Sequence, residues 1–338
     1  MPATNTSSAY SGRRMDNYPR IAGWGKALPK RIIDNSELER LVDTSDEWIQ
    51  RRTGIRERRI ASPEDTPASL AIEASKAALD IAGLSPNEID LIITAITIPE
   101  TIIPGCAFMI QDGLGAEGAG AFDINAACSG FVYGLATASQ FISCGTYKNI
   151  LVVGTEVLSR SVNWQDRSTC ILFGDAAGAV VVQASGRKCG PRSLVLGSDG
   201  AGGNAIMLNS TASRYAEGQE DSNSYITING QEVFRFGVST IITATRQAVS
   251  QAGLSIEDID LLIPHQANER IIQSATKTLG ISPEKVFINV HSYGNTSAAS
   301  IPVALCEAVE GDRIHEGDLV GLVGFGGGLS WGAMVYEW

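Results

Sequence analysis

Hydrophobic and polar positions along this chain form blocks that predict strands and helices in alternation. The uncharged apolar runs 91–98 and 150–155 predict buried strands. The amphipathic stretches 66–82 and 232–252 each stop at a glycine, as helices commonly do. Alternation of these two kinds of element predicts an α/β fold in which sheets are covered by helices.

The pattern is written twice. Residues 78–93 recur as residues 248–263, and each copy carries its stopping glycine at the same place, Gly83 in the first and Gly253 in the second. Val-Val-Gly at 152–154 and Leu-Val-Gly at 322–324 repeat at the same offset. Two such signatures at half the chain length indicate one fold repeated, so we expect two pseudo-symmetric halves, each with a mostly parallel sheet.

Two segments fall outside the repeated pattern. Residues 1–18 are rich in Ser and Thr and lack apolar periodicity, so we expect a disordered N-terminal tail without the apolar core of a signal peptide. Residues 185–225 are rich in Gly, Ser and Asn and are interpreted as the connection between the halves. The expected units are therefore the tail, a first half at 19–186 and a second half at 187–338.

Composition and charge exclude several classes of protein. The net charge of −11 argues against a nucleic-acid binder. The chain contains no run of 18 apolar residues, so no transmembrane helix is predicted. The six cysteines never form a Cys-x-x-Cys pair, which argues against a zinc site and a disulfide framework. We therefore expect neither nucleic acid nor membrane as a partner, no metal, and a reducing, cytoplasmic compartment.

Three chemically capable residues follow predicted strands. Cys128 lies between a short strand at 121–124 and a helix, where the helix start is expected to lower the pKa of the thiol. His265 follows the repeated strand, and Asn295 is a near-counterpart of Cys128 at almost the same offset. Singly, these residues are better explained as a packed cysteine, a core histidine and a turn residue. Because strand ends gather at one edge of an α/β sheet, together they predict a shared site.

The segment 44–59 combines an acidic helix start with a dense basic stretch around Trp48. Such a segment is either a solvated turn with its Trp in the core or a platform for an adenine nucleotide carrying phosphates, since Trp stacks and Arg pairs with phosphate. Composition alone leaves both interpretations open.

Six motifs, in this order, resemble β-ketoacyl-acyl-carrier-protein synthase III, a family of the thiolase superfamily that starts type II fatty-acid synthesis. The resemblance extends from about Ile21 to Trp338. The motifs are Thr-Ser-Asp-Glu-Trp-Ile at 44–49, Ala-Cys-Ser-Gly-Phe at 127–131, Asp-Arg at 166–167, Pro-His-Gln-Ala-Asn at 264–268, Gly-Asn-Thr-Ser-Ala-Ala-Ser at 294–300 and Phe-Gly-Gly-Gly at 325–328.

This resemblance implies a thiolase fold with five αβαβα layers, a homodimer, and no cofactor, because acyl-CoA is a substrate. It implies that Cys128 takes an acyl group from acyl-CoA, acetyl-CoA being the expected starter, and that His265 and Asn295 assist decarboxylation of malonyl-acyl-carrier protein. An oxyanion hole is implied at the amides of Cys128 and Gly327. The implied CoA contacts are Trp48, Arg52, Arg167 and Asn268.

The family also implies a basic docking surface for the acidic carrier protein, whose nearest matches here are Arg235, Arg270 and Lys277. The last two are seven residues apart in a helical stretch and are expected to share a face. The chain departs from the family at Ile103, where an aromatic residue from the partner subunit often completes the acyl pocket. The starter acyl group therefore stays open.

Three rival functions remain on sequence alone. A Cys/His/Asn set also describes papain-like hydrolases, although their sequences do not repeat at this offset. A non-catalytic acidic binding protein would form no acyl adduct at Cys128. The nearest rival is an acyltransferase of secondary metabolism that resembles synthase III and moves the acyl group to another acceptor.

Overall fold

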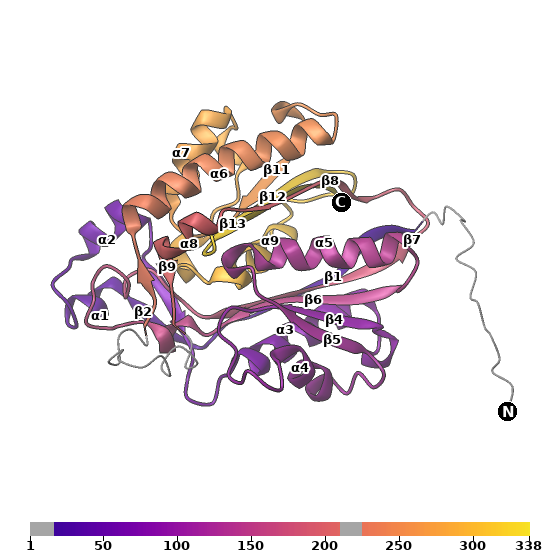
Figure 1. The fold of residues 1–338 in the computed structure, drawn as a ribbon, viewed down its shortest axis with the longest axis horizontal. Coiled ribbons are helices and arrows are strands. Elements are labelled where there is room, and N and C mark those ends of the chain that lie inside the picture. The colour runs from indigo at the N-terminus through magenta and orange to yellow at the C-terminus, as the bar shows by residue number, and fades with distance from the viewer. Residues whose placement is uncertain (1–16, 210–224) are drawn as a thin grey trace, which may run out of the picture.

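The computed structural model describes residues 17–209 and 225–338, which form five layers (Figure 1). Helices α3 (Pro67–Ala82) and α4 (Cys106–Leu114) cover the outer face of one sheet, and α6 (Gly230–Gln251) and α7 (Glu269–Leu279) cover the outer face of the other. Helices α5 (Gly130–Ser143) and α9 (Ser300–Glu310) lie between the two sheets and contact strands of both. The predicted α/β/α/β/α thiolase-type arrangement is confirmed.

The elements of the first half of the chain are β1 (Tyr18–Ala27), β2 (Arg31–Asp34), α1 (Asn35–Glu39), α2 (Asp46–Thr53), β3 (Glu57–Ile60), α3 (Pro67–Ala82), β4 (Leu91–Ala95), α4 (Cys106–Leu114), β5 (Gly120–Ile124), α5 (Gly130–Ser143), β6 (Asn149–Glu156) and β7 (Ala176–Ser185). Those of the second half are β8 (Gly190–Ser198), β9 (Ile206–Met207), β10 (Thr227–Ile228), α6 (Gly230–Gln251), β11 (Leu261–Pro264), α7 (Glu269–Leu279), α8 (Val290–Tyr293), α9 (Ser300–Glu310), β12 (Leu319–Gly326) and β13 (Ser330–Glu337).

Both sheets are mixed, so the expectation of mostly parallel sheets is wrong. In the first sheet, ordered β1-β7-β6-β4-β5, only the β4 pairings are parallel. In the second, ordered β11-β12-β13-β8, only β11 and β12 are parallel. The repeated helix–strand units do form parallel pairs. The chain then returns through shorter connections, such as residues 327–329 between β12 and β13, which suffice for antiparallel pairing.

The sequence offset between Gly83 and Gly253 is also the structural offset. Strand β6 corresponds to β12, and the short 3-10 turn Ala127–Ser129 (η2) corresponds to the turn Ser297–Ala299 (η8). Helices α5 and α9 begin directly after these two turns. Ala127 (φ 46°) and Ser297 (φ 49°) both adopt left-handed backbone conformations, which are uncommon outside glycine. The two halves therefore share an unusual turn as well as a topology.

Each of these turns packs against the central strand of the opposite half. A side chain at Gly154 in β6 would place its Cβ 2.3 Å from the Ala298 carbonyl oxygen of η8. A side chain at Gly324 in β12 would place its Cβ 3.0 Å from the Ser129 Cα of η2. Close approach of backbone to backbone at these two glycines brings the functional turns of both halves together.

Two expected boundaries need correction. Strand β1 begins at Tyr18, which pairs with Ser185, so the last residue assigned to the tail belongs to the first sheet; residues 1–16 lie outside the described residues. The start of this strand was not predicted because it is polar. Its extended conformation comes from pairing with β7 and not from an apolar pattern of its own. The segment interpreted as a connection contains strand β8, which pairs with β13. The change of sheet thus lies between Ser185 and Gly190, and the predicted boundary at 186/187 stays a prediction.

Within the described residues, none of the helices combines the length and the apolar character needed to cross a bilayer.

Substitution Gly154→Ala should lower the free energy of unfolding by about 1–3 kcal/mol, because the added methyl group overlaps the η8 backbone. Urea unfolding followed by circular dichroism measures this loss. Gly186→Ala is the matched control, since a Cβ there meets nothing within 4 Å. Equal stability of the two variants would contradict the packing described for η8.

Candidate active site

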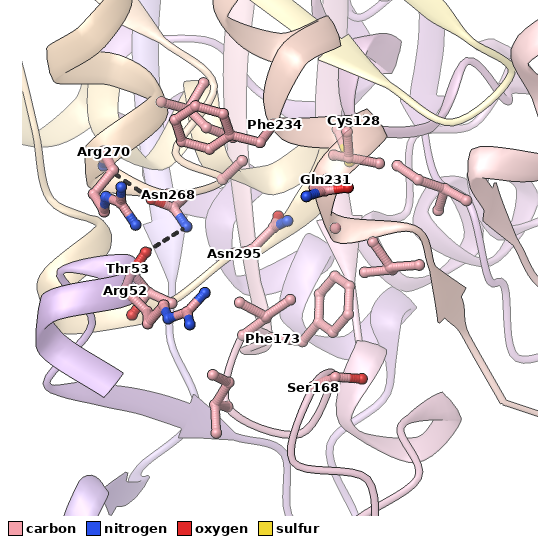
Figure 2. Close-up of a pocket in the computed structure, with 18 of the residues that line it drawn as sticks. Arg52, Thr53, Cys128, Ser168, Phe173, Gln231, Phe234, Asn268, Arg270 and Asn295 are labelled. Carbon is pink, nitrogen blue, oxygen red and sulfur yellow. Dashed lines mark hydrogen bonds between the residues drawn. The ribbon is translucent and has the colours of Figure 1, made fainter. Parts of the chain in front are cut away.

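Two cavities meet at Cys128. The first, of about 630 Å³, is lined by Cys128, His265 and Asn295 and extends to the arginines of α2 and α7. The second, of about 910 Å³, is lined by Cys128, Ile98, Leu158 and Gly327 among others and is mainly apolar. In Figure 2, Cys128 and Arg52 lie on opposite sides of the first cavity, with Asn295 between them. The predicted convergence of the three residues is present in the structure.

Cys128 lies in η2, immediately before α5 rather than within its first turn. The pKa of its thiol is raised to about 12 by burial, and a hydrogen bond with the Ser297 side chain lowers it only in part. The predicted lowering of this pKa by the helix start is therefore wrong. Desolvation of the thiolate outweighs the helix dipole, so Cys128 rests as a protonated thiol.

His265 follows β11 and is 1% exposed. Its Nδ1 lies 2.6 Å from the Ser300 Oγ, and its ring packs edge-on against Phe325 with ring centroids 5.2 Å apart. Burial lowers the pKa of His265 to about 3, so the ring is neutral near pH 7. The Ser300 Oγ also accepts a hydrogen bond from the Gln266 amide, which favours donation of its own proton to Nδ1 and leaves the ring proton on Nε2.

Asn295 is held through its backbone and one side-chain oxygen. Its amide donates to the Leu172 carbonyl at 2.8 Å, and its carbonyl accepts from the Gly174 amide at 3.1 Å. Its Oδ1 accepts from the Ser297 amide at 2.9 Å, which leaves the Nδ2 group as the side-chain donor at the cavity. His265 and Asn295 thus combine two neutral hydrogen-bond donors beside the thiol.

The structural counterpart of Asn295 is Asn125, not Cys128. Asn125 precedes Asn295 by the offset of the repeat, and its Oδ1 accepts from the Ala127 amide at 3.2 Å, as Asn295 does from Ser297. By the same offset Cys128 corresponds to Ala298. The expectation that Cys128 and Asn295 are near-counterparts is therefore corrected: they occupy different positions of one repeated Asn-turn motif.

The glycines at the end of β12 and directly after it bring backbone close to Cys128. A Cβ at Gly326 would lie 2.6 Å from the Cys128 amide nitrogen, so no side chain fits there. Gly327 follows directly and lines the apolar cavity together with Cys128. The amides of Cys128 and Gly327, which the family resemblance implies as oxyanion donors, thus lie in one close-packed region.

The four predicted CoA contacts all line the first cavity. The guanidinium carbons of Arg52 and Arg167 lie 5.3 and 5.5 Å from the centre of the Trp48 ring. Asn268 caps α7 and donates from Nδ2 to the Arg52 carbonyl at 3.1 Å. Trp48 is partly exposed, so the interpretation of this residue as purely a core residue is not supported, and the cavity mouth combines an aromatic face with two cations.

The three basic residues predicted for carrier docking are exposed on α6 and α7. Arg235 and Arg270 line the first cavity, and the Arg270 guanidinium lies over the Phe234 ring at 5.6 Å. Lys277 lies in the last turn of α7 and is not among the residues that line the cavity. Ile103 is 89% exposed and does not line the apolar cavity of its own chain, whereas its neighbour Ile102 does.

The sequence did not single out three polar residues that bear on the site. Ser300 contacts His265, and Ser297 contacts both Cys128 and Glu156, the last residue of β6. Ser297 and Ser300 stand within the motif around Asn295, so they could have been found by asking which partners a buried histidine and thiol require. The sequence indicates Glu156 only weakly, as a carboxylate at the end of an otherwise uncharged strand. In the described residues, no group of His, Cys, Asp or Glu side chains is arranged to hold a metal ion.

Comparison with known proteins places the chain in a family. Residues 122–213 match the family model described as 3-oxoacyl-[acyl-carrier-protein (ACP)] synthase III, and residues 249–338 match the model of its C-terminal part. A β-ketoacyl-[acyl-carrier-protein] synthase III from Symbiobacterium thermophilum is 51% identical over 321 residues, 94% of this chain and 97% of the relative.

Solved structures give the same result. The 3-oxoacyl-[acyl-carrier-protein] synthase III of Aquifex aeolicus VF5 is 46% identical with a TM-score of 0.90, covering 95% of this chain and 100% of that one. The priming β-ketosynthase of the R1128 polyketide biosynthetic pathway is 35% identical with a TM-score of 0.90, covering 96% and 98%. This chain belongs to the β-ketoacyl-[acyl-carrier-protein] synthase III family, acyltransferases of fatty-acid synthesis with a thiolase fold.

Proposed function

We propose that this protein condenses an acyl-CoA starter, acetyl-CoA in the first instance, with malonyl-acyl-carrier protein by decarboxylative Claisen condensation. The product is a 3-oxoacyl-acyl-carrier protein. The observation that carries the proposal is the meeting of a cysteine thiol with two neutral donors, His265 and Asn295, in one cavity. Hydrogen bonds then stabilise the negative charge that develops on the thioester oxygen, and the proposal requires neither a metal nor a cofactor.

In the first half-reaction Cys128 attacks the thioester carbonyl of acyl-CoA, and CoA leaves. The tetrahedral oxyanion requires preorganised donors, for which we propose the amides of Cys128 and Gly327. Loss of one such donor costs about 3 kcal/mol or more in comparable enzymes. The close approach of Gly326 to Cys128 supports this assignment, since it brings the two backbone segments together.

In the second half-reaction malonyl decarboxylation places negative charge on the thioester oxygen. A neutral His265 that carries its proton on Nε2 and an Asn295 that offers Nδ2 are suited to hold this enolate. The resulting carbanion attacks the acyl group on Cys128. A histidine whose pKa is about 3 serves here as a hydrogen-bond donor and not as a general base near pH 7.

The substrate arms enter through the first cavity in this proposal. Trp48 would stack on the adenine of CoA, Arg52 and Arg167 would pair with its phosphates, and Asn268 would contact the pantetheine arm. The second cavity, of about 910 Å³, would take the acyl chain. Because CoA and the carrier's phosphopantetheine would use one channel in turn, the kinetics should be of the ping-pong type.

Partners and compartment follow from surface features. Arg235, Arg270 and Lys277 would dock the acidic carrier protein on a chain whose net charge is −11. The exposed apolar residues Ile102 and Ile103 support a homodimer in which each subunit covers this loop of the other. All six cysteines are free, which supports a reducing, cytoplasmic location.

One alternative has a specific observation in its favour. The similar priming β-ketosynthase belongs to a polyketide pathway, so a role as starter enzyme of secondary metabolism fits the same active site. Ile103 stands where the family often has an aromatic residue that the partner subunit contributes to the acyl pocket, so the starter acyl group stays open. Mass spectrometry of Cys128 after exposure to mixed acyl-CoAs identifies the preferred starter and separates the two roles.

Incubation with acetyl-CoA and malonyl-acyl-carrier protein should release CO2 and yield a 3-oxoacyl-carrier product only when both are present. Cys128→Ser should abolish the product, because the hydroxyl is a much weaker nucleophile toward the thioester. Cys144→Ser, at an exposed cysteine away from the cavities, is the matched control. Thioester cleavage without condensation would instead indicate a hydrolase.

His265→Ala should retain acylation of Cys128 and slow condensation about 10²-fold or more, because one enolate donor is lost. Single-turnover acylation and release of labelled CO2 measure the two steps separately. Ser300→Ala should slow condensation less, since the ring stays but loses its Nδ1 partner. Condensation by His265→Ala at the parent rate would refute the assigned role.

Trp48→Ala should weaken CoA binding about tenfold or more, since stacking of a base on an aromatic ring contributes about 1–3 kcal/mol. Isothermal titration of the Cys128→Ser background with CoA measures the affinity without turnover. Trp338→Ala, which removes a Trp packed on Trp24 outside both cavities, provides the control. An unchanged dissociation constant for CoA would show that Trp48 serves only in packing.

A further inference from the structure

A buried carboxylate lies next to the nucleophile and is not used by the mechanism above. Glu156, the last residue of β6, is 0% exposed. Its Oε1 accepts hydrogen bonds from the Thr97 amide and from the Ser297 hydroxyl, each at 3.0 Å. Its Oε2 is buried and has no hydrogen-bond partner among the described residues. A buried carboxylate oxygen without a hydrogen bond lowers the stability of the fold. The presence of Glu156 at this position therefore needs an explanation.

The charges around Glu156 do not supply that reason. The titratable groups that interact with it are Cys128 of η2 and Cys106 of α4, and the pKa of each is raised. Burial raises the pKa of Glu156 to about 7, and its hydrogen bonds with Thr97 and Ser297 lower the pKa only in part; no Lys or Arg is among its interactions. The group is thus able to exchange a proton near neutral pH.

The thiol of Cys128 needs such a partner. It must lose a proton on acylation and regain one after condensation. His265 is poorly suited to accept this proton, because its Nδ1 already contacts the Ser300 hydroxyl and the favoured tautomer carries a proton on Nε2. The Ser297 hydroxyl, by contrast, donates to Glu156 Oε1 at 3.0 Å, and Ser297 lines the second cavity together with Cys128, whose thiol it influences. Ser297 is thus placed to pass a proton between the two residues.

We propose that Glu156 takes up the Cys128 proton through the Ser297 hydroxyl during acylation, stores it in the acyl-enzyme, and returns it during condensation. The inference rests on the proposed function, because it requires that Cys128 carries the acyl group. Glu156 touches neither substrate in this account and acts only through Ser297. The proton passed by Ser297 arrives at Oε1, the oxygen that the Ser297 hydroxyl contacts at 3.0 Å.

The two half-reactions balance. In acylation the Cys128 S–H bond and the acyl–S bond of CoA break, an acyl–S bond to Cys128 forms, Glu156 becomes a carboxylic acid, and CoA leaves as a thiolate that takes a proton from water. In condensation the malonyl carboxylate leaves as CO2, a carbon–carbon bond forms, and the acyl–S bond to Cys128 breaks. The Cys128 thiolate then takes its proton from Glu156, which restores the carboxylate.

This scheme predicts the pH dependence of acylation. The acceptor must be ionised, so the rate should rise as the pH passes through about 7 and level off above it. Glu156→Gln keeps an oxygen that can accept from Thr97 and Ser297 but cannot take up a proton. Its acylation should be slower by about 10²-fold at neutral pH and should increase with hydroxide concentration without levelling off.

The test is rapid-quench acylation of the full-length protein by acetyl-CoA, with intact-protein mass spectrometry between about pH 5 and pH 9. Ser297→Ala should reproduce the altered pH profile, because it interrupts the path and leaves the carboxylate in place. Asp175→Asn is the matched control, since Asp175 is also 0% exposed but hydrogen-bonds to Ser159 and the Ala61 amide instead. Thermal unfolding confirms that each variant is folded.

A levelling profile near pH 7 in Glu156→Gln or in Ser297→Ala, within about twofold of the parent rate, would overturn the relay. Loss of the profile in Asp175→Asn as well would also overturn it, because any buried carboxylate would then have the same effect. Should the parent protein form no Cys128 adduct at all, the proposed function itself fails, and this outcome is distinct from an unchanged profile in the variants.

Discussion

The active site depends on the close packing of two turns, each against the central strand of the opposite half. Gly154 and Gly324 have no side chain, which lets η8 lie on β6 and η2 lie on β12. Cys128 of the first half thereby lines one cavity with His265 and Asn295 of the second. Without these contacts, Cys128 would stay with the first half, and His265 and Asn295 with the second. The site therefore forms only where the two halves pack together.

Burial, more than charge, sets the protonation states in this site. It keeps His265 neutral, holds the Cys128 proton in place and brings the pKa of Glu156 close to neutrality. A neutral histidine can donate a hydrogen bond to an enolate, whereas a charged histidine would form an ion pair with the Cys128 thiolate. Cys128 is only partly exposed, and in the proposed relay Ser297 gives its proton a route to a buried acceptor.

Much of this arrangement could be predicted from the sequence because it is written as a repeat. The offset between Gly83 and Gly253 indicated two halves, and the strand ends indicated a shared site for Cys128, His265 and Asn295. Pairing direction was not predictable, because β7 and β13 are antiparallel through connections that carry no periodic signal. The thiol pKa was predicted in the wrong direction, since a helix start is visible in sequence but the depth of burial is not. Glu156 and Ser297 were missed because they are 141 residues apart and meet only in the fold.

The central claim is that Cys128 carries the acyl group between two half-reactions, and trapping of that intermediate tests it most directly. The protein is exposed to acetyl-CoA, freed of excess CoA and mapped by peptide mass spectrometry, and malonyl-acyl-carrier protein is then added. The proposed mechanism predicts an acetyl group on Cys128 alone, which disappears as the 3-oxoacyl-carrier product forms in equal amount. An unmodified Cys128 during productive turnover, or an adduct that the malonyl carrier does not consume, would contradict it.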